Sequence, residues 1–465
     1  MTKMCSVANT IVWGLPALLL IVGVGIYLTI RLSCLQLRLL PYALRRFFRM
    51  CRPGTGQDRS SFVSVCTALG ATVGTGNLVG VAGAICLGGP GAVFWMWICG
   101  FLGMITKYAE ATLAVRYRVT EQGSCLGGPM YMITRGMGEK YRPLAKAYCL
   151  FGVIAAFGVG NAAQINAVVT GVREVCGGVP SQRLDLLVGV ILAALIGTLL
   201  HGGAGKIGQA AQLLVPVAAG GYVILCLGVL TVCRDALGAA LAQILTGAFS
   251  PKAATGGILG SAFQTLRVGC SRGVFTNEAG MGTASIAHGE ADVDHPAQQG
   301  LMGMVEVFLD TIVICTLTAL VILVSGVPIP YGTDAGAVLA LNAFEQVYGD
   351  ISQIIITAML CLFAVATVLG WGLYGARCAQ FLFGSSAWKP FAAAQTAMIV
   401  ISSLMDTAAV WQFSETVNGL MVIPNLITLA ALSGELCRLT KEYTETRQKN
   451  AGGGTYADFY QCKPL

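Results

Sequence analysis

The chain has 465 residues, of which 55% are hydrophobic and only 11% are charged. Soluble domains carry about 25% charged residues, so this composition excludes an ordinary soluble protein and predicts an all-α polytopic membrane protein. The net charge is +7, and there are 17 cysteines. Most cysteines lie within apolar segments and none forms a C-x-x-C pair, so neither disulfides nor a metal centre is expected.

Hydropathy predicts eleven membrane segments, because a spanning helix needs about 20 apolar residues. The long linker 327–350 is expected to hold a short helix over residues 335–347. The eleven predicted segments are residues 9–31, 61–87, 92–116, 147–172, 184–200, 210–233, 256–287, 298–326, 351–383, 389–406 and 412–437.

Basic residues are concentrated in the linkers 32–60 and 117–146, which lie on the same side of the membrane if the segments alternate. The positive-inside rule assigns that side to the cytoplasm. We therefore expect a multi-pass plasma-membrane protein with its N-terminus outside and its C-terminus inside. The chain then divides into an N-terminal helix with a basic cytoplasmic linker (1–60), a ten-helix transport core (61–437) and a cytoplasmic tail (438–465).

The second segment is interrupted by glycine and polar residues. Five glycines fall between Gly70 and Gly83, around the sequence Gly74-Thr75-Gly76-Asn77. Each glycine costs a helix about 1 kcal/mol relative to alanine, and a membrane helix opens only where its freed backbone groups meet a cavity, a ligand or an ion. This favours a broken helix whose backbone binds a small charged solute. Close packing against another helix would use glycine equally well.

The seventh segment, 256–287, carries Arg272, Asn277 and Glu278 at membrane depth among seven glycines. A single helix of this length would span about 48 Å, against a hydrocarbon core of about 30 Å. The sequence therefore predicts two half-helices joined by an unwound stretch near Arg272 to Gly280. A structural ion pair between Arg272 and Glu278 is an alternative explanation of the charge.

The two predicted breaks are five segments apart. Because five is an odd number, corresponding helices run in opposite directions, which predicts a five-plus-five inverted repeat of residues 61–233 and 256–437. Paired broken helices indicate a midplane binding site in a secondary transporter. The chain has no G-x-x-x-x-G-K-[ST] loop and no H-E-x-x-H motif, so neither an ATP-driven pump nor a zinc protease is expected, and no enzyme activity is predicted.

Several longer motifs run from the second segment to Cys437. They are Gly74-Thr75-Gly76-Asn77 with Gly80-Val81-Ala82, Gly88-Gly89-Pro90-Gly91-Ala92, Phe94-Trp95-Met96-Trp97, Thr106-Lys107-Tyr108-Ala109-Glu110-Ala111-Thr112-Leu113, Gly160-Asn161, Gln164 with Asn166, Arg272-Gly273-Val274-Phe275-Thr276-Asn277-Glu278-Ala279-Gly280, Asp310-Thr311, Asn418-Gly419-Leu420-Met421 and Ile423-Pro424-Asn425-Leu426. With these residues the chain resembles the alanine or glycine:cation symporter family of bacterial and archaeal amino-acid carriers.

The resemblance implies the leucine-transporter fold and import of a small neutral amino acid with sodium by alternating access. Alanine or glycine is the first candidate, and a proton-coupled or uncoupled facilitator or channel is the alternative. It implies no cofactor beyond the co-transported sodium and no nucleic-acid partner, and it leaves the oligomeric state open. The implied substrate-binding residues are Gly74, Thr75, Gly76, Asn77, Gln164, Asn166, Phe275, Thr276 and Asn277.

The same resemblance implies a sodium site made by the carbonyl oxygens of Gly70 and Val73 with the hydroxyl of Thr367, since hard cations prefer oxygen ligands. The family often has a hydroxyl pair here, whereas this chain has Ala366-Thr367. Further departures from the family's G-W-x-Y-Y-G-E sequence are Gly372, Leu373 and Ala376.

Other polar residues within the segments have less definite interpretations. Lys107 and Glu110 are expected to form an ion pair or part of a gate. Glu306 and Asp310 share a helical face, and a structural or gating role is weighed equally with a role in coupling. Gln164 and Asn166 could instead hold helices together, and Trp371 could simply pack.

Overall fold

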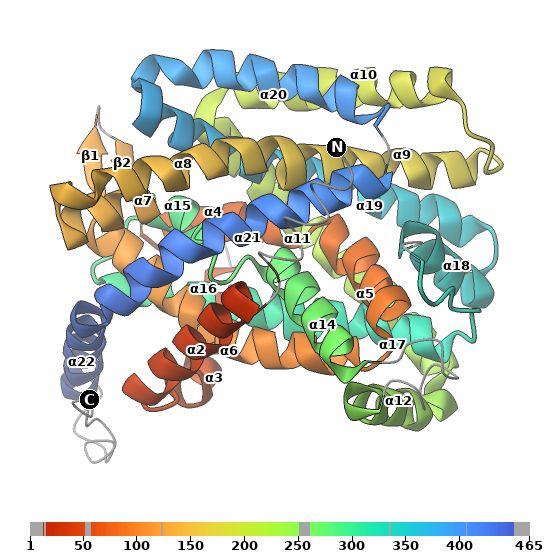
Figure 1. The fold of residues 1–465 in the computed structure, drawn as a ribbon, viewed down its shortest axis with the longest axis horizontal. Helices are drawn as coiled ribbons and strands as arrows, with labels where there is room; N and C mark the ends of the chain where they lie inside the picture. The colour runs from red at the N-terminus through yellow and green to blue at the C-terminus, as the bar shows by residue number, and fades with distance from the viewer. Residues whose placement is uncertain are drawn as a thin grey trace.

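The computed structural model describes residues 13, 15–51, 57–121, 124–250, 261–333, 336–405 and 407–450. These described residues are almost entirely helical (Figure 1). Strands within them are confined to one antiparallel hairpin, in which β1 (Val119–Glu121) pairs with β2 (Ser124–Leu126). The predicted all-α class is therefore confirmed.

The ten core segments all appear as helices. The first five segments contain α4 (Gln57–Thr72), η1 (Gly76–Gly80), α5 (Val81–Gly88), α6 (Ala92–Arg116), α8 (Arg142–Phe157), η4 (Gly158–Ala162), α9 (Ala163–Val175), α10 (Gln182–His201) and α11 (Gly203–Val232). The last five segments contain α14 (Ala262–Asn277), α15 (Ala284–Gly289), α16 (Pro296–Val307), η6 (Phe308–Cys315), α17 (Thr316–Val324), α19 (Ile351–Phe383), α20 (Trp388–Ser402) and α21 (Thr407–Ala431).

The structure also contains helices outside the ten core segments. The predicted short helix near residues 335–347 is present as α18 (Gly336–Tyr348). The basic linker, the stretch before α14 and the C-terminal tail were not predicted to be helical. In the structure they contain α3 (Leu35–Met50), α12 (Leu237–Phe249) and α22 (Ser433–Asn450). The remaining elements are α2 (Leu15–Arg31), which is the predicted extra N-terminal helix, α7 (Pro129–Tyr131), η2 (Met132–Met137), η3 (Glu139–Tyr141), η5 (Arg234–Ala236) and η7 (Ser385–Ala387).

Six described helices are long and apolar enough to cross a membrane, or up to nine spans if each bent helix pair counts as one. The core helices that belong neither to one of these six helices nor to a bent pair are α14 with 16 residues, α15 with 6 and α20 with 15. The eleven crossings therefore remain a prediction.

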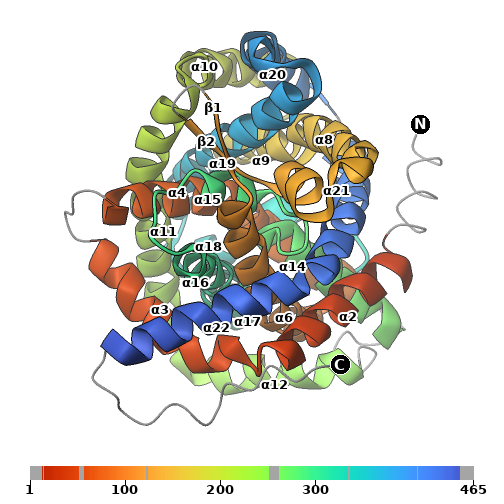
Figure 2. The same cartoon turned by 90° about the vertical axis from the view of Figure 1, so that its left-hand side faces the viewer.

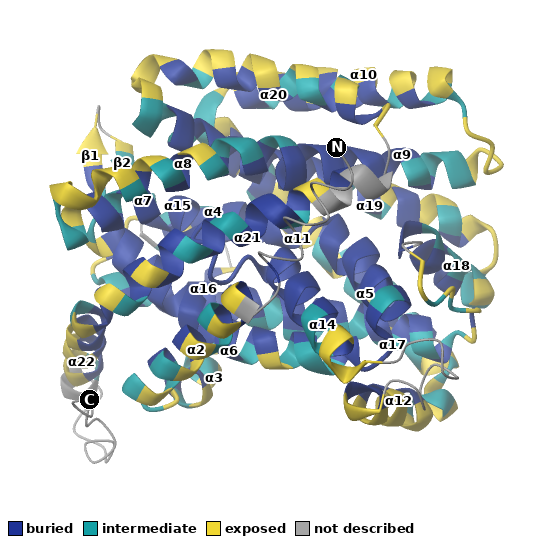
Figure 3. Ribbon diagram, viewed as in Figure 1, coloured by how far each residue is buried: buried dark blue, intermediate teal, exposed yellow. Residues whose placement is uncertain are grey.

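The helices form an enclosed centre and an apolar periphery. Within the apolar window of each helix, 72% of α6 and 67% of α19 are buried inside the protein, against 28% of α11. The helices α10 and α20 lie side by side at one edge, away from α2, α3 and α12 (Figures 1 and 2). Their outer faces are exposed (Figure 3). On α10 these faces carry apolar residues such as Leu187 and Ile191. Such a surface suits contact with lipid.

The two interrupted helices meet in this enclosed centre. The first, formed by α4 and then η1 with α5, bends by 46°. The helix α14 contacts both η1 and α5, and α15 contacts α4. The structure therefore brings the two predicted breaks together.

The second break differs in detail from the prediction. Arg272 lies inside α14, and the chain leaves the helix only after Asn277. Glu278 and the glycines at 280 and 282 then adopt positive φ values of 54°, 93° and 79°. Glycine reaches this region without strain, which explains why the helix ends here and not at Arg272.

The alternative explanation, an ion pair between Arg272 and Glu278, does not match the structure either. The Arg272 guanidinium lies 3.1 Å from a carboxylate oxygen of Glu415 on α21. Glu278 instead accepts a hydrogen bond of 2.6 Å from the Thr283 hydroxyl within the break. Arg272 therefore ties α14 to α21.

Candidate functional site

The first break is built by a short unwound stretch after α4. The Gly74 N–H donates a 2.9 Å hydrogen bond to Asn77 Oδ1, which closes the turn. The Thr75 hydroxyl donates to Gln164 Oε1 over 2.7 Å, and the Thr75 N–H approaches the same oxygen at 3.4 Å. Gln164 from α9 therefore lies against the opened backbone, as the sequence predicted.

Glycine at position 74 is required by a close approach between helices. A Cβ there would lie only 2.3 Å from the Thr367 hydroxyl oxygen on α19. At Gly76 a Cβ would lie 3.4 Å from carbon atoms of both Phe275 and Thr276. The backbone of η1 thus faces the last turn of α14 closely, and a larger side chain at Gly76 would fill that space.

The end of α14 is fixed by side-chain hydrogen bonds. Asn277 Oδ1 accepts from the Ala279 N–H at 2.9 Å, and Asn277 Nδ2 donates to the Thr311 hydroxyl at 3.0 Å. The Thr276 hydroxyl donates to the Gly273 carbonyl oxygen at 2.8 Å. Phe275, Thr276 and Asn277 are therefore all buried beside the first break.

Asn166 is the predicted substrate residue that the structure does not bring to the breaks. Its Nδ2 donates to the Met405 carbonyl oxygen at 3.0 Å, beyond the end of α20. It lies two residues after Gln164, and two residues turn an α-helix by about 200°. The geometry favours the alternative interpretation, in which Asn166 holds α9 against a neighbouring segment.

The residues predicted to hold sodium lie on α4 and α19, near the first break. The Thr367 hydroxyl donates to the Gly70 carbonyl oxygen at 3.0 Å. The helices are close because a Cβ at Gly370 would lie 2.7 Å from that of Ala71. Val73 is buried three residues after Gly70. The arrangement collects neutral oxygen atoms of the kind that bind alkali cations, while coordination by these residues remains a prediction.

Lys107 does not pair with Glu110, contrary to the sequence-based prediction. Its ammonium lies 3.3 Å from Glu306, and both side chains are fully buried. Glu110 Oε1 instead accepts from the N–H groups of Gly280 and Gly282, at 2.8 and 3.1 Å, and from Asn425 Nδ2 at 2.7 Å. The freed backbone of the second break is thus bound by a carboxylate from α6.

A buried polar chain that the sequence analysis missed continues from this ion pair. Glu306 Oε2 lies 2.7 Å from His288 Nε2, and His288 Nδ1 lies 2.8 Å from Gln299 Nε2. Gln299 Oε1 then accepts from the Ser61 hydroxyl at 2.6 Å. The chain connects α4, α6, α15 and α16. The sequence signal for this chain was the presence of ionisable residues in apolar segments. It could not show which residues pair, because the partners lie far apart in sequence.

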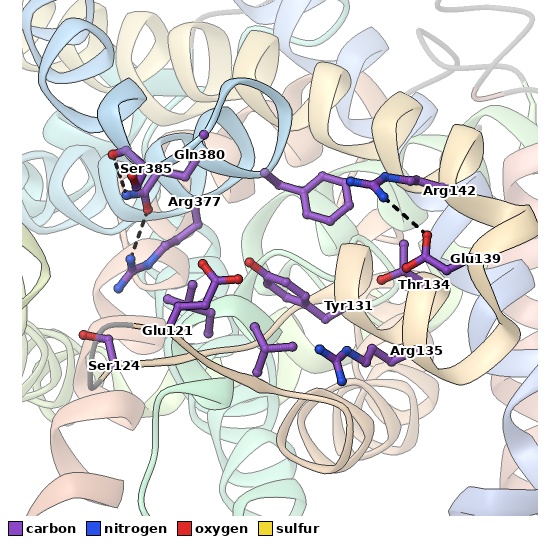
Figure 4. Close-up of a pocket in the computed structure, with 14 residues that line it drawn as sticks. Glu121, Ser124, Tyr131, Thr134, Arg135, Glu139, Arg142, Arg377, Gln380 and Ser385 are labelled. Carbon is purple, nitrogen blue, oxygen red and sulfur yellow. Dashed lines mark hydrogen bonds and ion pairs between the residues drawn. The ribbon is translucent and has the colours of Figure 1, made fainter.

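A cavity of about 490 Å³ lies apart from these residues, between the hairpin, the start of α8 and the end of α19 (Figure 4). Tyr131, Arg135, Arg142 and Arg377 line it, and none of the predicted site residues does. The described residues also contain no group of three His, Cys, Asp or Glu that could hold a metal ion.

Comparison with known proteins gives a consistent result. Residues 1–456 match the family described as "Sodium:alanine symporter family". The chain is 40% identical to the sodium/alanine symporter AgcS of Methanococcus maripaludis over 455 residues, covering 97% of this chain and 98% of that protein. It is 35% identical to the probable sodium/glutamine symporter GlnT of Bacillus subtilis over 453 residues, covering 96% and 91%.

A solved structure shows the fold independently. The crystal structure of MhsT in complex with L-phenylalanine superposes with a TM-score of 0.58 at 17% sequence identity, covering 80% of this chain and 88% of MhsT. This likeness confirms the predicted leucine-transporter type of fold.

Proposed function

Because the chain belongs to the sodium:alanine symporter family, we propose that it imports a small neutral amino acid, alanine or glycine first, together with sodium by alternating access. It is a multi-pass membrane symporter of amino acids and not an enzyme. We place its N-terminus outside and its C-terminus in the cytoplasm of a cell whose plasma membrane it spans, following the positive-inside rule.

The hydrogen bond of 3.0 Å between Thr367 and the Gly70 carbonyl is the observation that carries the sodium assignment. It places a hydroxyl from α19 beside a carbonyl of α4, within one turn of the break. In our proposal, sodium inserts between these oxygens and takes the Val73 carbonyl as a third ligand. Binding would then hold α4 against α19, which couples the ion to the position of the broken helix.

The amino acid is assigned to the adjoining space between the two breaks. Thr75 and Gly76 present the N–H groups that begin η1, where a helix N-terminus favours an anion such as the substrate carboxylate. Gln164 Oε1 is an acceptor suited to the substrate ammonium. A Cβ at Gly76 would lie 3.4 Å from Phe275, so the Phe275 ring borders this space.

The test is uptake of radiolabelled alanine and glycine by purified protein in proteoliposomes. An inward sodium gradient should drive accumulation above equilibrium, and unlabelled serine and glutamine should define the size limit. Accumulation driven by a proton gradient alone would show that the coupled ion is a proton and not sodium. Equilibration without accumulation under either gradient would favour the facilitator, because a facilitator has no obligatory coupling to an ion.

A further inference from the structure

The helix α3 leaves the N-terminal helix α2 at a sharp angle. The two helices are bent by 81° to each other, and Ser33 and Cys34 at the turn have positive φ values of 52° and 53°. The 17 residues of α2 fall in the range of about 17–25 residues that crosses a bilayer. The four arginines of α3 would be costly inside the hydrocarbon core. With α2 across the membrane, α3 therefore lies nearly parallel to the membrane surface.

One face of α3 is fixed to the rest of the protein. Leu39, Ala43 and Phe47 are buried, and their spacing of four residues places them on one side of the helix. The helix contacts α4, α6 and α16. In addition, Arg46 Nη2 donates a hydrogen bond of 3.0 Å to Gln298 Oε1 on α16. These contacts determine which side of α3 faces away from the protein.

The outer face of α3 consists of an apolar stripe beside a basic stripe. Leu37 and Phe48 are 62% and 60% exposed, and Pro41 is exposed between them. At about 100° per residue, these three residues fall within about 40° of the helix circumference. Arg45 and Arg49 are also exposed, and they occupy the adjoining sector of about 40°. Apolar residues beside basic residues are typical of a helix that lies in the membrane–water interface.

The positive charge of this outer face is not balanced within the protein. The sequence of α3 contains no Asp or Glu. The side chains of Arg45 and Arg49 form no ion pair or hydrogen bond with any other residue that the structure describes. Anionic phospholipids of the cytoplasmic leaflet attract basic segments that follow a membrane helix. Ile26 and Ile30, on the last turns of α2, are exposed as well, so the chain presents apolar surface to the membrane on both sides of the turn.

We propose that the outer face of α3 binds anionic phospholipids of the cytoplasmic leaflet. Leu37 and Phe48 lie among the acyl chains, and the guanidinium groups of Arg45 and Arg49 bind headgroup phosphates, whose oxygens match the donors of arginine. The inference uses the membrane orientation given with the proposed function, but neither its substrate nor its ion. The bound lipid contacts a helix that Arg46 joins directly to the transport core.

The experiment measures which lipid lies beside α3. Phe48→Trp adds a fluorescent reporter on the outer face, and the wild-type protein, with its six native tryptophans, gives the background. Both proteins are reconstituted into phosphatidylcholine vesicles that contain a small fraction of either brominated phosphatidylglycerol or brominated phosphatidylcholine. Bromine quenches tryptophan fluorescence only at short range. We expect brominated phosphatidylglycerol to quench the reporter more strongly than brominated phosphatidylcholine does.

The arginines should account for this preference. Adding Arg45→Gln and Arg49→Gln to the reporter protein should lower the preference for phosphatidylglycerol by up to about fivefold for each arginine removed. High salt should lower it in the reporter protein itself, because salt screens exposed charges. Arg183→Gln with Arg234→Gln is the matched control. It removes the same charge from exposed positions outside α3 and should leave the preference unchanged.

Three results would overturn the proposal. The first is equal quenching of the reporter by the two brominated lipids, and the second is a preference that survives both the loss of Arg45 and Arg49 and high salt. The third is no quenching by either lipid, which would show that protein, such as a second copy of the chain, covers the outer face. The salt arm needs no arginine variant, so it decides even if the double variant does not fold. None of these readouts requires uptake, so failure of the proposed function would be distinguishable.

Discussion

Lys107 on α6 and Glu306 on α16 form an ion pair of 3.3 Å in which both side chains are completely buried. Charges in such a position are retained only when they compensate each other. The pair begins the polar chain through His288 and Gln299 to Ser61 at the start of α4. It thereby links α6 to α4, the first half of the interrupted helix.

Neutralising one partner of this pair should be more damaging than neutralising both. Glu306→Gln leaves a buried ammonium without its counter-charge, and breaking a buried pair in this way typically costs about 3–5 kcal/mol. The double variant Lys107→Met with Glu306→Gln removes both charges and should recover a large part of that loss. Unfolding of the purified variants in detergent measures both effects. Additive losses in the double variant would show that the two side chains do not interact.

Gly74 and Gly80, two of the glycines near the first break, should tolerate substitution by alanine very differently. Gly74→Ala places its Cβ 2.3 Å from the Thr367 hydroxyl, so α4 and α19 must separate. We expect sodium-dependent uptake to fall to background. Gly80→Ala is the matched control, because its Cβ meets only a methyl carbon of Thr276 at 3.8 Å. The measurement is the sodium-dependent uptake of the two variants at matched expression. Normal uptake by Gly74→Ala would remove the ion site from this contact.

We expect Gln164 to act in transport and Asn166 to act in helix packing. Gln164→Ala removes the acceptor of the Thr75 hydroxyl and should raise the half-saturating alanine concentration by about fivefold to a hundredfold, as expected for ~1–3 kcal/mol. Asn166→Ala removes only the bond to the Met405 carbonyl. It should lower stability with little change in apparent affinity. The measurement is the kinetics of uptake. If Asn166→Ala raised the half-saturating alanine concentration and Gln164→Ala did not, Asn166 would belong to the substrate site.

The sequence was sufficient for features that depend on local composition and spacing. Helix breaks show as glycine clusters, and the structure brings the two predicted breaks together, while the inverted repeat inferred from the odd offset between them stays a prediction. It was not sufficient for side-chain pairing. Lys107 and Glu110 lie three residues apart, which suggested a pair, yet Glu306 lies 3.3 Å from Lys107 across the fold. Arg272 likewise pairs with Glu415. Such partners depend on how helices pack, which periodicity within one helix does not contain.

The sequence also did not predict correctly where the second interrupted helix unwinds. The charged residues suggested that the helix opens near Arg272. The arginine stays in the helix because its side chain forms an ion pair with Glu415 on another helix. The positive φ values at Glu278, Gly280 and Gly282 determine the end of the helix. The amphipathic helix α3 was missed because its pattern mixes basic and apolar residues within a linker that was assessed for charge alone.

The last prediction concerns Ala366, the buried neighbour of Thr367. A sodium ion bound between Gly70, Val73 and Thr367 lacks the second hydroxyl that related carriers are expected to provide. Thr367→Ala removes the hydroxyl that lies 3.0 Å from the Gly70 carbonyl, so sodium dependence should nearly disappear. Ala366→Ser adds an oxygen at the adjacent position and should lower the half-saturating sodium concentration. Losing or gaining a buried polar contact is worth about 1–3 kcal/mol, or roughly fivefold to a hundredfold. The measurement is the sodium dependence of alanine uptake in both variants and in wild type at matched expression. If Thr367→Ala retains the wild-type sodium dependence, the ion does not bind between α4 and α19, although the membership of the symporter family would stand.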